Sequence, residues 1–298
     1  MNALYLTLAY FLIYSFLGWC CEVIYCTLNS GTFVNRGFLN GPYCPIYGFG
    51  MVGILALLEP VFDNMPLLFL GATLITSSIE LAGGWLLYKL FHARWWDYSN
   101  KPFNLGGYIC AEFCLIWGLA TLGVIKFLHP VVTLLVTRVI LDFLKWPFVI
   151  LGCLIMAVDT AASAATAVGL NRKLKELDDL NKALRRHSDV LSNILGATAF
   201  TVDQIKDEQQ LQLLLGKAEA AQRLGELKEE AGQRLEDLKG DLKANAARRS
   251  QLMKRLSGTH LVGPHRMLDA FPSLKHSDYS ETLSLLRSAL DDLNPMKK

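Results

Sequence analysis

The chain has 298 residues, of which 52% are hydrophobic and 19% are charged, and its mean hydropathy is +0.30. This composition is too apolar for an ordinary soluble protein, and it excludes collagenous, disordered and disulfide-scaffold proteins. Residues 171–298 hold 41 of the 56 charged side chains but a net charge of only +3, which gives no strong signature of nucleic-acid binding. We therefore expect a membrane domain joined to a water-soluble tail, with no nucleic acid as partner.

The apolar part of the chain divides into segments that match the thickness of a bilayer. A membrane-spanning helix needs about 20 apolar residues. Five segments approach this length, the second being short and rich in glycine: residues 4–26, 46–62, 67–91, 107–128 and 148–170. Residues 131–146 carry Arg138, Asp142 and Lys145 at helical spacings, which predicts an amphipathic helix that lies at the membrane interface or packs against protein. We predict an all-α polytopic bundle over residues 1–170, with about five spans and one amphipathic helix.

Basic residues predict the orientation of this bundle. The loop between the third and fourth segments carries three basic residues, and three more open the tail, whereas the loop between the second and third segments has none. Because basic segments stay on the cytoplasmic side, we predict a multi-pass protein of the cell membrane with its amino end outside and its tail in the cytoplasm. The region from 126 to 145 would then be external although it carries three basic residues.

Three carboxylates lie within the apolar segments. Glu22 is in the first segment, Glu80 in the third and Glu112 in the fourth. Charged groups inside a membrane are costly and often mark a functional site. In the predicted topology, all three converge on one cavity that faces the cytoplasm. Alternatively, each bonds only to a neighbouring helix or to one buried cation. Asp159 and Ser163 form a further polar stripe in the last apolar segment.

Two loops between the segments carry the densest polar patterns. Residues 35–50 contain four glycines and two prolines, which no regular helix accommodates, beside the lone Arg36. We predict a re-entrant or cavity-lining loop in which Arg36 pairs with a carboxylate or holds an anionic group; an ordinary cytoplasmic turn is the alternative. Residues 95–104 form the second loop. Further candidate binding residues in and beside the two loops are Asn35, Asn40, Tyr47, Asp97, Tyr98 and Asn104.

These loops resemble those of a known family, the bacterial CmpB-type membrane proteins, which are described as ABC-transporter permeases of type IV and have vertebrate multi-pass relatives. The resemblance covers about the first 170 residues and does not extend to the tail. It implies a transport function. The residues that carry it are Trp19, Glu22, Asn35-Arg36-Gly37, Pro45-Ile46-Tyr47-Gly48, Glu80, Trp96-Asp97-Tyr98-Ser99 and Asn104.

No motif for catalysis or nucleotide binding competes with this interpretation. The chain has no G-x-x-x-x-G-K-[ST] phosphate loop, no G-x-S-x-G elbow and no H-E-x-x-H pattern, so an ATPase would be a separate subunit. None of the seven cysteines has a histidine at ligand spacing, and we expect no metal and no cofactor.

Three functions remain open from the sequence. The first is a permease-like subunit that moves a small or polar solute, in which the three glutamates bind a cation, a proton or a polar ligand and Arg36 gates or neutralises them. The second is a membrane enzyme acting on a lipid-linked or apolar substrate, with one glutamate as general base. The third is a membrane-anchored scaffold that acts through its tail.

The tail divides into two parts. Residues 171–258 carry leucines at heptad-like spacings, which predicts a coiled-coil-like helical region. Its two arms, within residues 171–256, would fold back as an antiparallel hairpin or pair with a helical partner or a second copy of the chain. Residues 259–298 predict a loop and a short helix over about 279–293, with Ser277 as its cap and Pro295 as its stop.

Overall fold

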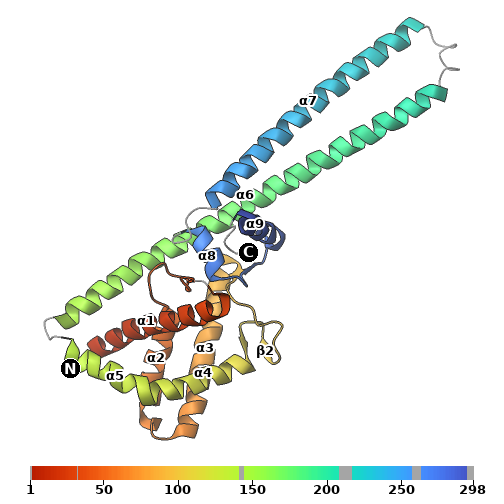
Figure 1. Cartoon of the computed structure of the whole chain (residues 1–298). Helices are drawn as coiled ribbons and strands as arrows, with labels where there is room; N and C mark the ends of the chain where they lie inside the picture. The colour runs from red at the N-terminus through yellow and green to blue at the C-terminus, as the bar shows by residue number, and fades with distance from the viewer. Residues whose placement is uncertain (1, 32, 141–143, 208–216, 257–262, 294–298) are drawn as a thin grey trace. The chain divides into compact units, whose positions relative to one another are not determined.

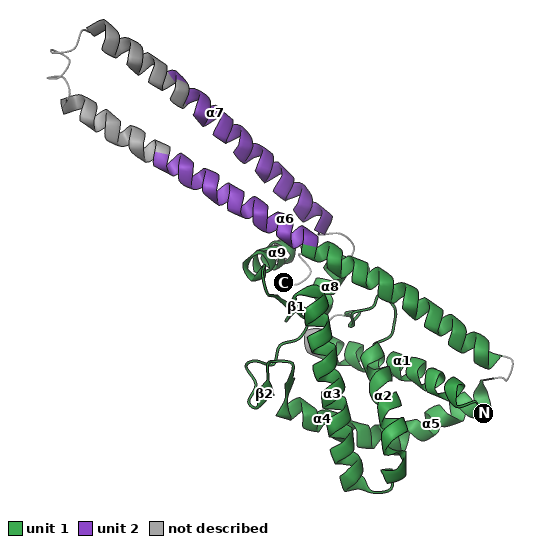
Figure 2. Ribbon diagram, turned by 180° about the vertical axis from the view of Figure 1, so that it is seen from behind, with its two compact units in different colours: residues 1–171, 258–298 green, residues 172–257 purple. Residues whose placement is uncertain are grey.

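Figure 1 shows the fold in a computed structural model, which describes residues 2–31, 33–140, 144–207, 217–256 and 263–293. The chain forms two compact units, coloured separately in Figure 2. One comprises Met1–Asn171 together with Gly258–Lys298, and the other comprises Arg172–Ser257. The first unit therefore contains both the beginning and the end of the chain, and it holds all the candidate site residues.

The first unit begins with two closely packed helices. Helix α1 (Ala3–Ser30) starts at the cap Asn2, whose side chain accepts a hydrogen bond from Leu4 N. Helix α2 (Pro45–Leu58) is followed by the short 3₁₀ helix η1 (Glu59–Val61). A Cβ atom at Gly48 of α2 would overlap the Ser15 hydroxyl of α1, so only glycine permits this approach of the two backbones.

The third and fourth helical stretches are longer. Helix α3 covers Met65–Phe91. After it, α4 (Ala111–Gly123), the π-helix η2 (Val124–Leu128), α5 (His129–Leu134) and the π-helix η3 (Leu135–Val139) follow one another without a break. The sequence predicted two separate segments here, 107–128 and 131–146. The structure instead continues the helix through Pro130, although proline lacks a backbone N–H, and the π-helix η2 lies directly before that turn.

The predicted amphipathic helix over 131–146 is therefore wrong. Residues 131–139 complete the fourth long helix instead, and Lys145 and Trp146 begin helix α6 (Lys145–Asp207). Asp142, which also belongs to the predicted pattern, lies outside the described residues.

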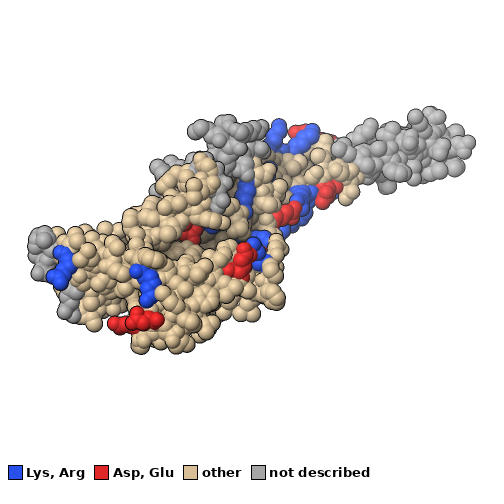
Figure 3. All heavy atoms as spheres, turned by 60° about the horizontal axis from the view of Figure 1, so that its bottom comes forward, with Lys and Arg blue, Asp and Glu red and all other residues tan. Residues whose placement is uncertain are grey.

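The helices of the first unit have the length and surface of membrane helices. Four are long and apolar enough to cross a bilayer, namely Ala3–Leu28, Met65–Phe91, Ala111–Val139 and Lys145–Asn193, and Pro45–Val61 is a shorter apolar helix. Large apolar side chains point outward; Leu70 and Leu74 of α3 are 62% and 70% exposed. On the face shown in Figure 3, charged side chains are few and separated by wide uncharged areas. A helical membrane bundle is confirmed, and the count of five spans stays a prediction.

The buried core of this unit joins all the long helices. It includes side chains from α1, α2, α3, the fourth helical stretch and α6: Tyr5, Ala9, Tyr14, Met51, Ile54, Leu68, Ile125, Val132, Val136 and Val149. Its polar atoms are paired, since Tyr14 Oη lies 2.9 Å from His129 Nδ1 and Tyr5 Oη donates to Val136 O at 3.3 Å. This core positions the helix ends that carry the polar loops.

The C-terminal segment adds elements that the sequence did not predict. Helix α8 (Pro264–Ala270) and strand β4 (Lys275–His276) precede α9 (Ser280–Leu293), which agrees with the predicted last helix. Strand β4 pairs antiparallel with β1 (Ala93–Arg94), and a second small sheet joins β2 (Asn104–Leu105) to β3 (Ile109–Cys110). The predicted cap Ser277 lies before the start of α9 at Ser280, and its hydroxyl donates to His92 O instead. Pro295, the predicted stop, lies outside the described residues.

The second unit consists of two long helical arms, the later part of α6 and helix α7 (Lys217–Leu256). Figures 1 and 2 show the arms running antiparallel. Arg248 of α7 donates to Glu176 of α6 from Nε at 3.1 Å and from a terminal nitrogen at 2.9 Å. Coiled-coil packing along the arms stays a prediction, because the side chains of residues 194–228 lie outside the description.

Candidate functional site

The first polar loop, described over residues 33–44, lies between α1 and α2 and is held by side chains rather than by regular structure. Trp19 Nε1 donates to Asn35 Oδ1 at 2.7 Å, and Asn35 Nδ2 donates to the backbone oxygen of Asn40 at 2.7 Å. Cys44 N donates to Ser15 O at 2.8 Å, which ties the end of the loop to α1. These bonds satisfy backbone and side-chain groups that would otherwise be costly to bury.

Asp159 of α6 binds this loop from the other side. One carboxylate oxygen accepts Asn40 Nδ2 at 2.8 Å and Asn40 N at 3.2 Å, and the other accepts Gly41 N at 2.7 Å. Burial and a hydrogen bond to Asp159 raise the pKa of Tyr43 to about 12. Ser163, one turn along α6, accepts from Asn40 Nδ2 at 3.0 Å. The polar stripe of the last apolar segment thus fixes the first loop.

Arg266 of α8 completes the loop, and the sequence gave no indication of it. Its side chain is only 2% exposed and donates to four oxygens of the loop. The distances are 3.1 Å to Asn40 Oδ1, 2.9 Å to Gly37 O, 2.8 Å to Phe38 O and 3.4 Å to Asn35 O. The segment opens with Gly263-Pro264, a helix-start pattern, but nothing in the sequence links that helix to the loop.

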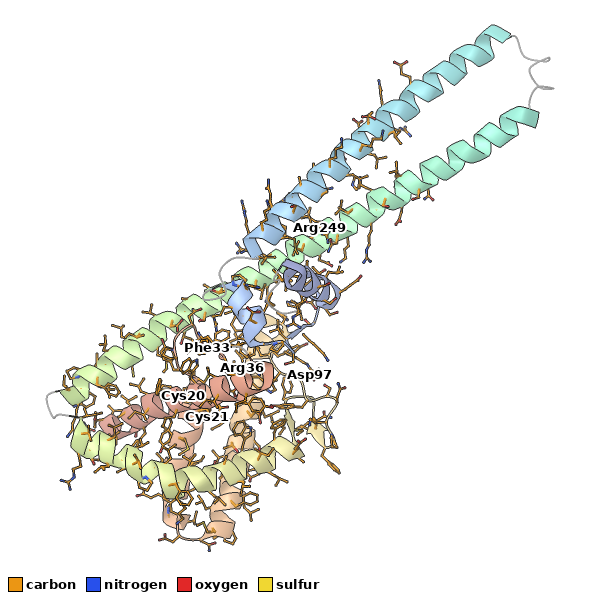
Figure 4. The ribbon with its side chains drawn as sticks, viewed as in Figure 1. Cys20, Cys21, Phe33, Arg36, Asp97 and Arg249 are labelled. Atoms are coloured by element: carbon orange, nitrogen blue, oxygen red, sulfur yellow. The ribbon has the colours of Figure 1, made fainter. Side chains whose placement is uncertain are left out.

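Arg36 and Glu22 form an ion pair beside the loop, as the sequence allowed for Arg36. Arg36 Nε lies 3.5 Å from Glu22 Oε2, and each side chain is about one quarter exposed, at 25% and 26%. Tyr47 Oη of α2 donates to the other oxygen of Glu22 at 2.5 Å. Arg36 also donates to Cys26 Sγ at 3.1 Å. Figure 4 labels Arg36 at the α8 end of α1, and the cation lies 5.9 Å from the centroid of the Phe271 ring.

The second polar loop, residues 92–110, is organised around Asp97. Its carboxylate accepts Lys275 Nζ at 2.7 Å and the Ser99 backbone N at 3.0 Å, and Arg94 lies 3.7 Å away. Burial alone would raise the pKa of Asp97, but hydrogen bonds from Lys275 and Ser99 outweigh it and lower the pKa to about 2. Asn104 Nδ2 donates to Lys101 O at 2.8 Å within the same loop. Asp97 and Asn104 thus have structural partners.

The two loops lie against each other. The rings of Phe38 and Trp95 are 5.1 Å apart in an edge-on arrangement, and Trp95 packs in the same way on Phe271 of the C-terminal segment at 4.7 Å. The C-terminal segment therefore contacts the second loop, and the two loops lie on the same face of the bundle.

Glu80 of α3 lies between the second loop and the other helices. It is 9% exposed, and Tyr98 Oη donates to its Oε1 at 3.2 Å. Burial and the Glu80 charge raise the pKa of Tyr98 above its ordinary value. Glu80 Oε2 is buried with no partner at normal hydrogen-bond geometry among the described residues, and the Trp117 indole of α4 interacts with the Glu80 carboxylate. Trp117 packs edge-on against Tyr47, the partner of Glu22, with 5.7 Å between ring centroids.

The structure thus brings two of the three predicted carboxylates into one network. Glu22, Tyr47, Trp117, Glu80 and Tyr98 follow one another in contact, and they come from four different helices and the second loop. Glu112 stands apart: it accepts Lys101 Nζ at 2.9 Å, and both side chains are nearly half exposed. Glu112 is placed in a surface ion pair.

Residues 9–164 match the model of one protein family, which is described as "Putative ABC-transporter type IV". This segment covers more than half of the chain and includes both polar loops and the carboxylates at 22, 80, 112 and 159. It ends before the helical arms and the C-terminal segment. No curated protein and no solved structure matches the chain.

Proposed function

The chain belongs to the ABC-transporter type IV family of CmpB membrane proteins, and on this premise we propose that it is a permease-like subunit that moves a small or polar solute. The solute would pass through a cavity open to the cytoplasm and lined by the membrane carboxylates. The membrane location follows from the family and from the four long apolar helices. We place the protein in the cell membrane, with its tail on the cytoplasmic side.

The observation that carries this proposal is the network that links Glu22 to Glu80. A carboxylate buried among apolar helices costs free energy unless it is paired or neutralised. Glu80 Oε1 accepts a hydrogen bond from Tyr98, whereas Oε2 has no partner at normal hydrogen-bond geometry among the described residues. A carboxylate oxygen with such an unused acceptor position is suited to bind a proton, a cation or a polar solute for a limited time. Most buried polar atoms with a purely structural role have a hydrogen-bond partner.

The ion pair of Arg36 and Glu22 supports a gating function at the same place. At 3.5 Å between Nε and Oε2, the pair is looser than the usual charge-assisted hydrogen bond of about 2.7–2.9 Å, and both groups remain partly exposed. The arginine can therefore exchange its partner for an anionic group of a solute and release Glu22. Asn35, Asn40, Tyr47, Asp97, Tyr98 and Asn104 would hold the two loops that flank this pair.

Energy for transport would come from a second protein. The chain has no phosphate-loop motif, so we expect a separate ATPase subunit that associates with the membrane unit. The helical arms of the second unit are available for a helical partner or a second copy of the chain.

The test combines purification with uptake. The full chain is extracted from its own membrane in mild detergent, and the proteins that co-purify are identified. Inside-out membrane vesicles are then supplied with ATP and a panel of labelled cations, amino acids and other polar solutes. We expect a co-purifying ATPase and ATP-dependent accumulation of at least one solute. The variant Glu80→Gln should lower that accumulation about tenfold or more, since it removes a charge that the proposed path uses.

The matched control is Glu59→Gln, because Glu59 is an exposed carboxylate outside the network. If Glu59→Gln and Glu80→Gln have equal effects, the Glu22–Glu80 network is not the path. If no ATPase co-purifies and no solute accumulates, the permease proposal is wrong.

A further inference from the structure

The first loop surrounds the Arg266 side chain with oxygen acceptors. The N–H groups of Nε and of both terminal nitrogens point to Asn40 Oδ1 and to the backbone oxygens of residues 35, 37 and 38. All four acceptors are carbonyl or amide oxygens. Among the residues that the structure describes, no carboxylate lies within ion-pair distance of Arg266. The guanidinium is thus bound as a hydrogen-bond donor in a fitted site.

The acceptors are oriented by contacts that do not involve Arg266. The Asn40 amide donates through Nδ2 to Asp159 and Ser163, which turns its oxygen toward the arginine. Asn35 is fixed by Trp19 and by the Asn40 backbone. The Asn40 amide also transmits the charge of Asp159, because it donates to that carboxylate and accepts from the cation. A site whose acceptors are already held in place loses little freedom when a ligand enters.

The geometry selects a guanidinium over an ammonium group. A guanidinium carries five N–H donors in a rigid planar fork, whereas an ammonium is a compact charge with three donors on one atom. Here the acceptors are distributed over Nε and both terminal nitrogens, at 2.8–3.4 Å. One nitrogen could reach only some of them.

The other polar contacts of the C-terminal segment involve few residues or are exposed to solvent. Helix α8 has seven residues, and the pairing of β1 with β4 covers two residues on each strand. The Lys275 side chain, which reaches Asp97, is 62% exposed. Arg266 is therefore the most deeply buried polar contact between residues 263–293 and the two loops.

We propose that residues 35–40, together with Asp159, form a guanidinium-binding site, and that Arg266 is its built-in ligand. Occupied by Arg266, the site holds residues 263–276 against both loops. Vacated by Arg266, it accepts a guanidinium group from outside, carried by a small compound or by an arginine side chain of another protein. The guanidinium site does not depend on transport, so failure of the permease proposal leaves it standing, and the reverse also holds.

The test is chemical rescue in the purified full-length protein. The variant Arg266→Ala empties the site, and hydrogen exchange of the backbone amides in residues 264–276 reports whether the segment stays in place. We expect exchange there to accelerate roughly tenfold or more, because the segment loses its most deeply buried polar contact, that of Arg266 with the first loop. Methylguanidinium at millimolar concentration, the probe, should slow exchange of the loop amides at 37–41 in a saturable manner. Methylammonium at equal ionic strength should not.

Two further variants keep the test decisive. Arg287→Ala removes another arginine of the same segment, which donates to Phe271 O at 2.8 Å. Methylguanidinium should leave hydrogen exchange in this variant unchanged. Arg266→Lys retains the charge without the fork, so exchange of residues 264–276 should still be faster than in the wild type. The proposal is overturned if methylammonium protects as well as methylguanidinium, if protection does not saturate, or if Arg266→Lys matches the wild type.

Discussion

The two polar loops are built in opposite ways. The first loop is held mainly by residues far away in the sequence, Asp159 and Arg266, which are 119 and 226 positions from Asn40. The second loop is held mainly by its own residues, since Asn104, Ser99 and Arg94 bond within it. Lys275 is its one distant ion-pair partner among the described residues. A loop closed by distant groups depends on the whole fold, whereas a loop closed by its own side chains depends on local geometry.

The largest expected effect comes from the distant anchor of the first loop. Asp159→Ala leaves the backbone N–H groups of Asn40 and Gly41 without their acceptor, and each unsatisfied buried donor costs about 1–3 kcal/mol. We expect the free energy of unfolding to fall by about 2–4 kcal/mol, measured by tryptophan fluorescence of the detergent-purified protein. The control Thr166→Ala removes a hydroxyl that bonds within its own helix, and it should cost less than about 0.5 kcal/mol.

The next effect tests local closure of the second loop. Gly107 has a φ of 75°, and a Cβ there would lie 2.5 Å from Ser99 Oγ and 2.7 Å from Asp97 Oδ1. Gly107→Ala should therefore destabilise the protein by about 1–3 kcal/mol in the same unfolding assay. Gly106→Ala is the matched control, because its φ of 59° carries the same backbone strain but its Cβ meets only the Tyr108 ring at 3.5 Å. Equal losses would show that overlap with the Asp97 cluster is unimportant.

The smallest effect concerns the tie between the second loop and the C-terminal segment. The pKa of Asp97 is lowered to about 2, so its ionised form contributes stability above the unfolded pKa of about 3.9. That contribution is lost as the pH falls from about 4 to 2. Lys275→Met removes the donor and should raise the pKa of Asp97, which moves the acid loss of stability to higher pH. Because Lys275 is largely exposed, we expect at most about 1 kcal/mol at pH 7.

The control for that variant is Lys101→Met, which breaks the exposed pair with Glu112 and leaves Asp97 untouched. Acid unfolding followed between pH 2 and pH 6 compares the two variants. An identical acid midpoint in Lys275→Met and the wild type would contradict the assigned cause of the Asp97 shift.

The sequence predicted the features that arise from local pattern. Long apolar runs predicted the helices, and glycine and proline predicted an irregular loop over 35–50. Residues 35–44 are irregular, but the prediction was wrong for residues 45–50, which begin helix α2 at Pro45. The rarity of charge within apolar segments drew attention to Glu22 and Glu80, which share a network, but also to Glu112, which faces a lysine at the surface. Local pattern cannot distinguish these two outcomes, because they depend on which neighbouring helix each side chain meets.

The features that the sequence missed depend on contacts between distant segments. Arg266 lies in a seven-residue helix, too short to show a helical periodicity, and the strand that follows it has two residues. The separation of residues 107–128 from 131–146 was wrong for another reason. The two segments are joined through π-helical turns, and no residue pattern in the sequence predicted those turns.

The pairing of β1 with β4 has a consequence for the order in which the protein is made. Ala93 meets His276, so the membrane unit remains incomplete until the ribosome has synthesised the helical arms and the residues beyond them. During that interval the backbone oxygens of residues 35, 37 and 38 lack their hydrogen-bond donor Arg266. A ribosome that stalls within the arms would leave a nascent chain whose helices have entered the bilayer but whose first loop is still open.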